Sequence, residues 1–143
     1  MKLYYITFLL LVTLSVKAQE STNDLINKSF STKVGYMCQE TDTPNPCAGQ
    51  QIYLELKFKK EKVVILEKYV SSCNKVNETE IGQFKWSLLK NNEVKIYSDS
   101  EKIKYTYLKN LKLELSNKVL VGEKIWEHTE PEKYVFIENN TQD

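Results

Sequence analysis

Hydrophobic and polar residues alternate with a period of two along most of the chain after position 28. From Ile52 to Lys59, an apolar residue at every second position is followed by a tyrosine, a glutamate or a lysine. This is the pattern of a β-strand with one buried and one exposed face. Further strands are predicted near 29–38, 62–70, 84–88, 94–96, 103–107, 111–115, 119–121 and 134–137. We expect about eight or nine strands and no helix longer than a single turn.

Short polar turns connect these segments. Lys60-Glu61, Asn91-Asn92, Lys109-Asn110 and Ser116-Asn117 each separate two apolar runs, and asparagine tolerates the positive φ of a tight hairpin turn. Strands joined in this way form an antiparallel meander, which commonly closes to remove its edges. We therefore predict an all-β, closed or half-open barrel over 29–138 and favour it over a two-sheet sandwich. An N-terminal segment (19–28) and a disordered tail (139–143) would flank the barrel.

The first 18 residues have the pattern of a secretory signal peptide. Lys2 precedes an apolar run from Leu3 to Val16, which is shorter than the roughly 20 residues of a membrane span. We expect cleavage after Ala18, a secreted or periplasmic location and no membrane span in the mature chain. Cleavage would remove two of the 20 lysines and none of the 19 acids, leaving a net charge of −1. The chain contains no arginine, and this composition argues against nucleic acid as a partner.

Two stretches carry a resemblance to a known group of proteins. Leu25-Ile26-Asn27-Lys28-Ser29-Phe30 resembles the entry to the first strand of lipocalin-like and META-type (calycin-type) exported bacterial domains. The segment Gly82-Gln83-Phe84-Lys85-Trp86, followed by 90–96, is similar to a hairpin of the same groups. The resemblance implies a small β-barrel and transfers no functional residues, because ligands in such folds vary with the loops.

Three cysteines make a disulfide the expected state of an exported chain. Cys38 ends the first predicted strand, Cys47 precedes the second and Cys73 follows the third. A meander places all three at one rim, so each of the three pairings is open, and we favour Cys38–Cys47. A thiolate site for a soft metal is the alternative. Because no Cys-x-x-Cys spacing is present, we expect neither a metal site nor a cofactor.

No catalytic motif is present in the sequence. The single histidine, His128, lies in an acidic stretch before Pro131, and we interpret it as a surface residue. Aromatic side chains on the predicted strands could line a barrel mouth; the candidates are Phe84, Trp86, Tyr105 and Tyr107. We therefore expect a non-enzymatic protein that binds a small apolar ligand or a protein partner. The alternatives are an extracytoplasmic inhibitor or immunity-type protein and a thiol-based metal-handling protein.

Overall fold

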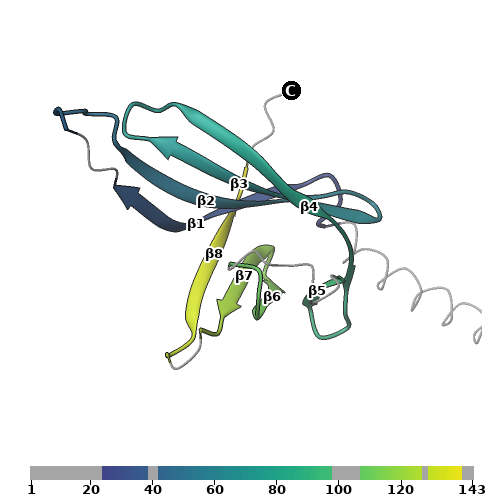
Figure 1. Cartoon of the computed structure of the whole chain (residues 1–143). Helices are drawn as coiled ribbons and strands as arrows, with labels where there is room; N and C mark the ends of the chain where they lie inside the picture. The colour runs from purple at the N-terminus through teal and green to yellow at the C-terminus, as the bar shows by residue number, and fades with distance from the viewer. Residues whose placement is uncertain (1–23, 39–41, 98–106, 127–128, 140–143) are drawn as a thin grey trace, which may run out of the picture.

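The computed structural model describes residues 24–38, 42–97, 107–126 and 129–139, and the fold within these ranges is an antiparallel β-barrel (Figure 1). Eight strands follow one another around a closed barrel in sequence order, and β1 pairs with β8. Their bounds are β1 (Ser29–Cys38), β2 (Gly49–Phe58), β3 (Lys62–Ser71), β4 (Val76–Leu88), β5 (Glu93–Tyr97), β6 (Leu111–Ser116), β7 (Val119–Lys124) and β8 (Glu132–Glu138). The predicted all-β meander and its closure are confirmed.

Asparagine residues form the tight turns, as predicted. Asn92, Asn110 and Asn117 have φ values of 64°, 60° and 50°, a region that asparagine enters at lower cost than most other residues. One expected strand is wrong at its end: Tyr107 lies in the turn that precedes β6, and the rest of 103–107 lies outside the described residues. Ile125 and Trp126 lie beyond β7 and belong to no strand.

The interior is packed most tightly at the end where β1 begins. Leu25 is fully buried there and plugs the barrel. The Asn27 amide donates to the Phe58 carbonyl, and the Phe58 amide donates to the Lys28 carbonyl. Phe58 contacts Phe30 and Trp86 edge to face, with ring centroids 6.0 and 5.0 Å apart. This sealed end, including the N-terminal turn, is held by apolar burial and backbone hydrogen bonds together.

The sheet of β1–β4 extends beyond the barrel proper. β4 pairs with β5 only from Lys85 to Leu88, so the earlier part of β4 pairs with β3 alone. In Figure 1, this longer sheet carries the hairpin tips away from the short strands β5–β8. Residues 76–80 are exposed, which fits a sheet edge that no other described strand covers.

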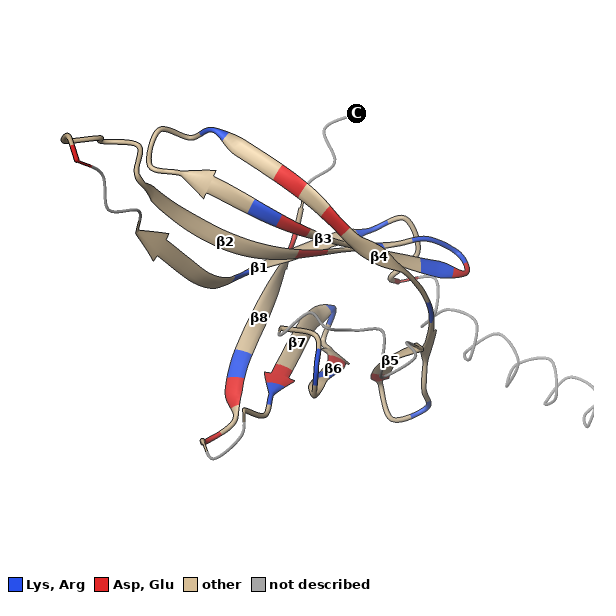
Figure 2. Ribbon diagram, viewed as in Figure 1, with Lys and Arg blue, Asp and Glu red and all other residues tan. Residues whose placement is uncertain are grey.

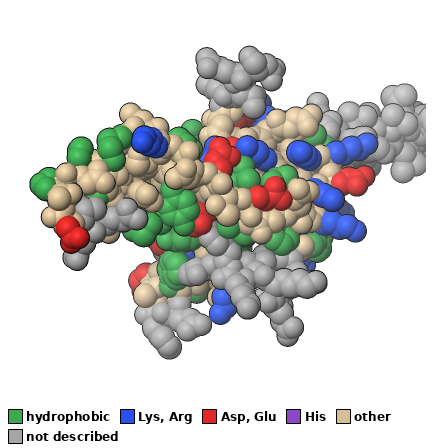
Figure 3. Space-filling view, turned by 45° about the horizontal axis from the view of Figure 1, so that its top comes forward, with side chains coloured by type: hydrophobic (Ala, Val, Ile, Leu, Met, Phe, Trp, Pro, Cys, Tyr) green, Lys and Arg blue, Asp and Glu red, His purple; other side chains and the backbone are tan. Residues whose placement is uncertain are grey.

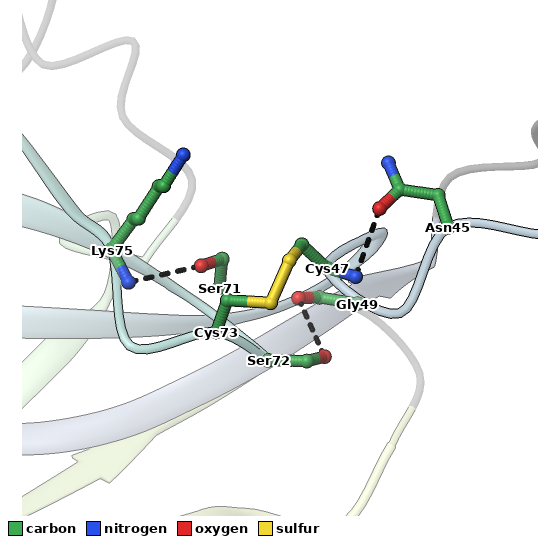
Figure 4. The surroundings of a disulfide bond; sticks show 7 residues. All are labelled: Asn45, Cys47, Gly49, Ser71, Ser72, Cys73 and Lys75. Carbon is green, nitrogen blue, oxygen red and sulfur yellow. Dashed lines mark hydrogen bonds between the residues drawn. A yellow bond between two sulfur atoms is a disulfide. The ribbon is translucent and has the colours of Figure 1, made fainter.

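The tip of this sheet carries the disulfide, which joins Cys47 to Cys73 (Figure 4). The expected Cys38–Cys47 pairing is therefore wrong, although all three cysteines do lie at one end of the sheet. Cys38 is opposite Gly49 on the β1 side of β2. On the other side of β2, the amide of Ser72 donates to the carbonyl of Gly49. That bond brings Cys73 to Cys47, with Cα atoms 5.1 Å apart, and leaves Cys38 free and exposed.

Loss of this disulfide should lower the free energy of unfolding. The Cys47→Ser/Cys73→Ser double variant should lose about 3 to 4 kcal/mol, because the bond closes a loop of 26 residues in the unfolded chain. Urea denaturation under non-reducing conditions measures the loss. Cys38→Ser is the matched control and should unfold within about 0.5 kcal/mol of the parent. Equal losses in both variants would contradict the pairing.

The barrel closes through a narrow seam between β1 and β8. Only Phe30 and Ser31 are in register with β8, and the Asn139 amide extends the seam by donating to the Ser29 carbonyl. The Asn139 side chain accepts from Ser31 at 2.7 Å and donates to the Glu55 carboxylate at 2.9 Å. Asn139, which we expected to begin the tail, is thus bound to the barrel wall. The expected remainder of the tail, 140–143, lies outside the described residues.

Glu55 is the centre of a buried polar network on the outer face of the barrel. Its side chain is 3% exposed and accepts hydrogen bonds from Ser29 and Asn139. The Lys68 ammonium lies 2.6 Å from Glu55 and 3.2 Å from Glu78 on β4, so it links three strands. Figure 2 shows acidic and basic residues interspersed along β3 and β4. Burial opposes ionisation of Glu55, but the Lys68 ammonium and the Ser29 hydroxyl outweigh it, so its pKa is lowered.

Candidate binding site at the β5–β6 end of the barrel

The end of the barrel opposite Leu25 carries an aromatic cluster, defined by Tyr107, Trp126 and Tyr134. The rings of Tyr107 and Trp126 meet edge to face, with centroids 6.0 Å apart. The Tyr107 hydroxyl lies over Gly35, where an added Cβ would come within 2.8 Å of it. A glycine at this point of β1 therefore allows the tyrosine to pack against the strand. These contacts fix the turn at 107–110 against β1 and against the segment that follows β7.

Charged groups surround the aromatic cluster. The Glu132 carboxylate accepts from the Trp126 indole at 2.9 Å and from the Tyr134 hydroxyl at 2.6 Å. These two donors lower the pKa of Glu132. Burial and the Glu132 charge together raise the pKa of Tyr134, so the phenol stays protonated at neutral pH. The site thus holds a fixed negative charge beside an uncharged hydroxyl.

Lys124 is the buried cation of this site. It is 2% exposed, faces the interior at the end of β7 and donates to the Lys109 carbonyl. Its ammonium also lies 4.5 Å from the centroid of the Trp126 ring, within the range of a cation–π contact. Burial and the nearby Lys109 lower the pKa of Lys124. The ammonium therefore holds both the 107–110 turn and the Trp126 ring in place.

A slot opens beside this cluster, between β5 and β6. The two strands are in register only at Glu93↔Glu114 and Val94↔Leu113. Beyond those pairs they separate around a hollow of about 190 Å³. Five aliphatic and three charged side chains line it: Val94, Ile96, Leu108, Leu111 and Leu113, with Glu93, Lys95 and Lys112. Leu108 belongs to the same turn as Tyr107, and Leu111 is in register with Lys124, so slot and cluster are continuous.

The structure places the four predicted lining residues in different environments. Tyr107 belongs to the aromatic cluster, whereas Tyr105 lies outside the described residues. Trp86 is buried near the sealed end, where its indole donates to the Lys59 carbonyl at 2.8 Å. Phe84 packs against the core with its ring over Gly82. Trp86 and Tyr107 are therefore not brought together, and contact of any of these residues with a ligand stays a prediction.

Of the aromatic cluster and its charged neighbours, only Tyr107 was among the predicted lining residues; Lys124, Trp126, Glu132 and Tyr134 were not, and neither were the residues that line the slot. A partial signal existed, because Glu132 and Tyr134 are two residues apart on one strand and so share a face. Trp126 and Lys124 gave no such signal, since a lysine at a strand end is ordinarily a solvated residue. Their placement depends on how β7 and the 107–110 turn meet in space.

The disulfide bears on the alternative of a thiolate metal site. Cys47 and Cys73 are bonded to each other, which takes two of the three sulfurs out of any thiolate metal set. Within the described ranges, no three His, Cys, Asp or Glu side chains are grouped as metal ligands. His128 lies outside the described residues. In the same ranges, no helix has the length and apolar character needed to cross a membrane.

Comparisons with known proteins found no match among family models, curated proteins or solved structures. We therefore infer a function from the geometry of the barrel and its hollows.

Proposed function

We propose that this chain is an exported, non-enzymatic binding protein of the lipocalin-like, META or calycin type, which takes a small apolar molecule in the β5–β6 slot. The observation that carries the proposal is the slot of about 190 Å³, which is lined by five aliphatic and three charged side chains. An apolar cavity of about 150 Å³ is large enough to admit benzene. A molecule of one ring or a short branched chain therefore fits the slot, whereas most drug-sized ligands need at least about 300 Å³.

The surroundings of the slot support binding rather than catalysis. The charged residues of the neighbouring cluster are each engaged by hydrogen bonds: Glu132 with Trp126 and Tyr134, and Lys124 with the Lys109 carbonyl. The slot wall itself offers side chains without nucleophilic or acid–base chemistry, apart from its three charged residues. The disulfide Cys47–Cys73 supports the exported location, because such bonds persist in oxidising compartments.

Filling the slot should abolish ligand binding. The probes are toluene, indole and phenol, observed by saturation-transfer NMR and by titration of tryptophan emission. Ile96→Trp places a larger ring into the hollow and should weaken binding of these probes at least about tenfold, which corresponds to about 1.4 kcal/mol. The slot lies inside the wall of a folded barrel, so the variant should keep the parent circular dichroism spectrum.

Val135→Trp is the matched control, because Val135 is 57% exposed on the outer face of β8. It adds the same ring away from the slot and should bind the probes within about twofold of the parent. Absence of saturation transfer for all three probes, or equal binding by Ile96→Trp and the parent, would refute the proposed function.

A second candidate function is binding of a protein partner, for an inhibitor or immunity-type role. The favouring observation is that β5 and β6, as far as the structure describes them, pair only at Glu93↔Glu114 and Val94↔Leu113, so Lys95–Tyr97 have no partner on β6. An extended segment of a partner could pair with such edges by strand addition. In that case, the slot would accept one apolar side chain of the partner, and a peptide would compete with toluene for it.

A further inference from the structure

Six lysines gather at the sealed end of the barrel, and we call them the basic end: Lys28, Lys57, Lys59, Lys60, Lys62 and Lys85. Lys59 and Lys62 flank the β2–β3 turn, where the Lys59 amide donates to the Lys62 carbonyl. Lys28 is joined to the same turn through the Phe58 amide. Figure 2 shows basic residues on both sides of this turn, and Figure 3 shows lysine side chains gathered at this end of the molecule.

Among the described residues, acids pair with only two of the six lysines of the basic end, Lys28 and Lys57. Lys62 is directly opposite Lys85 in the β3–β4 register, although like charges in cross-strand pairs are destabilising. No ion pair joins Lys59, Lys60, Lys62 or Lys85 to any acid that the structure describes. Glu61 is the acid within the turn itself. The cluster therefore keeps an excess of positive charge, and a bound anion would relieve its internal repulsion.

A hollow of about 390 Å³ lies within the basic end. Its lining includes three lysines and one carboxylate; the residues are Lys28, Lys57, Lys59 and Glu55, with Asn27, Ser29, Phe58 and Asn139. Lys28 pairs with Glu138 at 3.2 Å, and Lys57 lies 3.9 Å from Glu55, whose main cationic partner is Lys68. Three lysines thus border the hollow, while the charge of its one lining carboxylate, Glu55, is engaged by Lys68.

We propose that the basic end binds an anionic polysaccharide, with one acidic sugar unit in the hollow and its neighbours along the β2–β3 turn. This site is separate from the β5–β6 slot and does not depend on the proposed ligand there. A lipid bilayer fits less well, because few of the exposed large hydrophobic side chains of the described residues lie beside the basic end; Tyr97, opposite Lys85, is one that does. Nucleic acid fits less well because the chain has no arginine, the residue that pairs bidentately with phosphate.

The test compares two triple variants of equal net charge. Lys59→Gln/Lys60→Gln/Lys62→Gln removes charge from the basic end, and Lys33→Gln/Lys75→Gln/Lys133→Gln removes it from exposed lysines elsewhere. Heparin and polygalacturonate serve as sulfated and carboxylated probes, with neutral dextran as the blank. Isothermal titration at about 0.15 M salt measures binding where surface charges are partly screened.

The parent should bind one or both anionic polysaccharides and not dextran. The basic-end variant should lose about tenfold or more in affinity, since each lysine–anion contact in water contributes up to about fivefold. The control variant should stay within about twofold of the parent, and circular dichroism should show both folded. Absence of binding to either polysaccharide, or equal losses in the two variants, would overturn the proposal. Tighter binding to phosphatidylglycerol vesicles or to single-stranded DNA would also overturn it, in favour of a membrane or a nucleic acid.

Discussion

Lys68→Met should destabilise the protein by about 3 to 5 kcal/mol, because it leaves the buried Glu55 carboxylate without its ammonium partner. Glu55 is 3% exposed, and Lys68 lies 2.6 Å from it and is itself 24% exposed. Methionine keeps most of the aliphatic volume of the lysine, so the loss reports the charge rather than packing. The free energy of unfolding from urea denaturation at pH 7 measures the effect.

The double variant Glu55→Gln/Lys68→Met distinguishes two sources of the loss. One is the cost of a buried carboxylate without a cation, and the other is the loss of the ion-pair contact itself. It removes both charges and keeps an amide that can bond to Ser29 and Asn139, so it should recover more than half of the single-variant loss. A double variant as unstable as Lys68→Met would contradict this account. Lys33→Met, at an exposed position on β1, should change stability by less than about 0.5 kcal/mol.

The same network sets the acid stability of the fold. The pKa of Glu55 is lowered from its ordinary value of 4.5, so its ionised form is the one that the native state favours. Its contribution is present in full above about pH 4.5 and is lost as the pH falls through the lowered pKa. In Lys68→Met this part of the acid dependence should shrink, because Ser29 and Lys57 alone favour the ionised carboxylate less than they do together with Lys68.

The strand pattern predicted the barrel because alternation and turn chemistry are local properties. The strand from Ile52 to Phe58 could be predicted from the period of two alone. The turns at Asn92 and Asn117 could be predicted from the tolerance of asparagine for positive φ. The role of Glu55 was not predictable in this way. It occupies a position that alternation assigns to the wet face, and its burial depends on Asn139, which is 84 residues away in the chain.

The disulfide shows a second limit of reasoning from the sequence. Strand order placed Cys38, Cys47 and Cys73 at one end, and this was correct. The choice of pair depended on which side of β2 each cysteine approaches, and that is decided by the Ser72 to Gly49 hydrogen bond. The candidate site likewise depends on how segments meet in space. Tyr107 could be singled out as an aromatic residue, but its partners Trp126 and Lys124 follow from the path of the chain after β7.

Phe58→Ala should be the other strongly destabilising change, with an expected loss of about 3 to 5 kcal/mol. Phe58 is 1% exposed and contacts both Phe30 and Trp86. Its backbone also bonds to the N-terminal turn through Asn27 and Lys28. Removal of the ring leaves a cavity at the sealed end. The buried Leu25 side chain has little freedom to move and fill it. Urea denaturation followed by circular dichroism measures the loss.

Tyr36→Ala provides the matched aromatic deletion, because Tyr36 is 75% exposed on β1. It should change the free energy of unfolding by less than about 0.5 kcal/mol.

Trp86 also provides a local probe of unfolding at the sealed end, since its indole donates a hydrogen bond to the Lys59 carbonyl beside Phe58. If the sealed end is the most cooperative part of the barrel, Phe58→Ala should shift Trp86 exposure and global unfolding to lower urea together. A different outcome would be exposure of Trp86 at lower urea with an unchanged midpoint of global unfolding. It would mean that the N-terminal turn and Leu25 open independently of the strands. The stability of the fold would then depend on the β5–β6 half of the barrel.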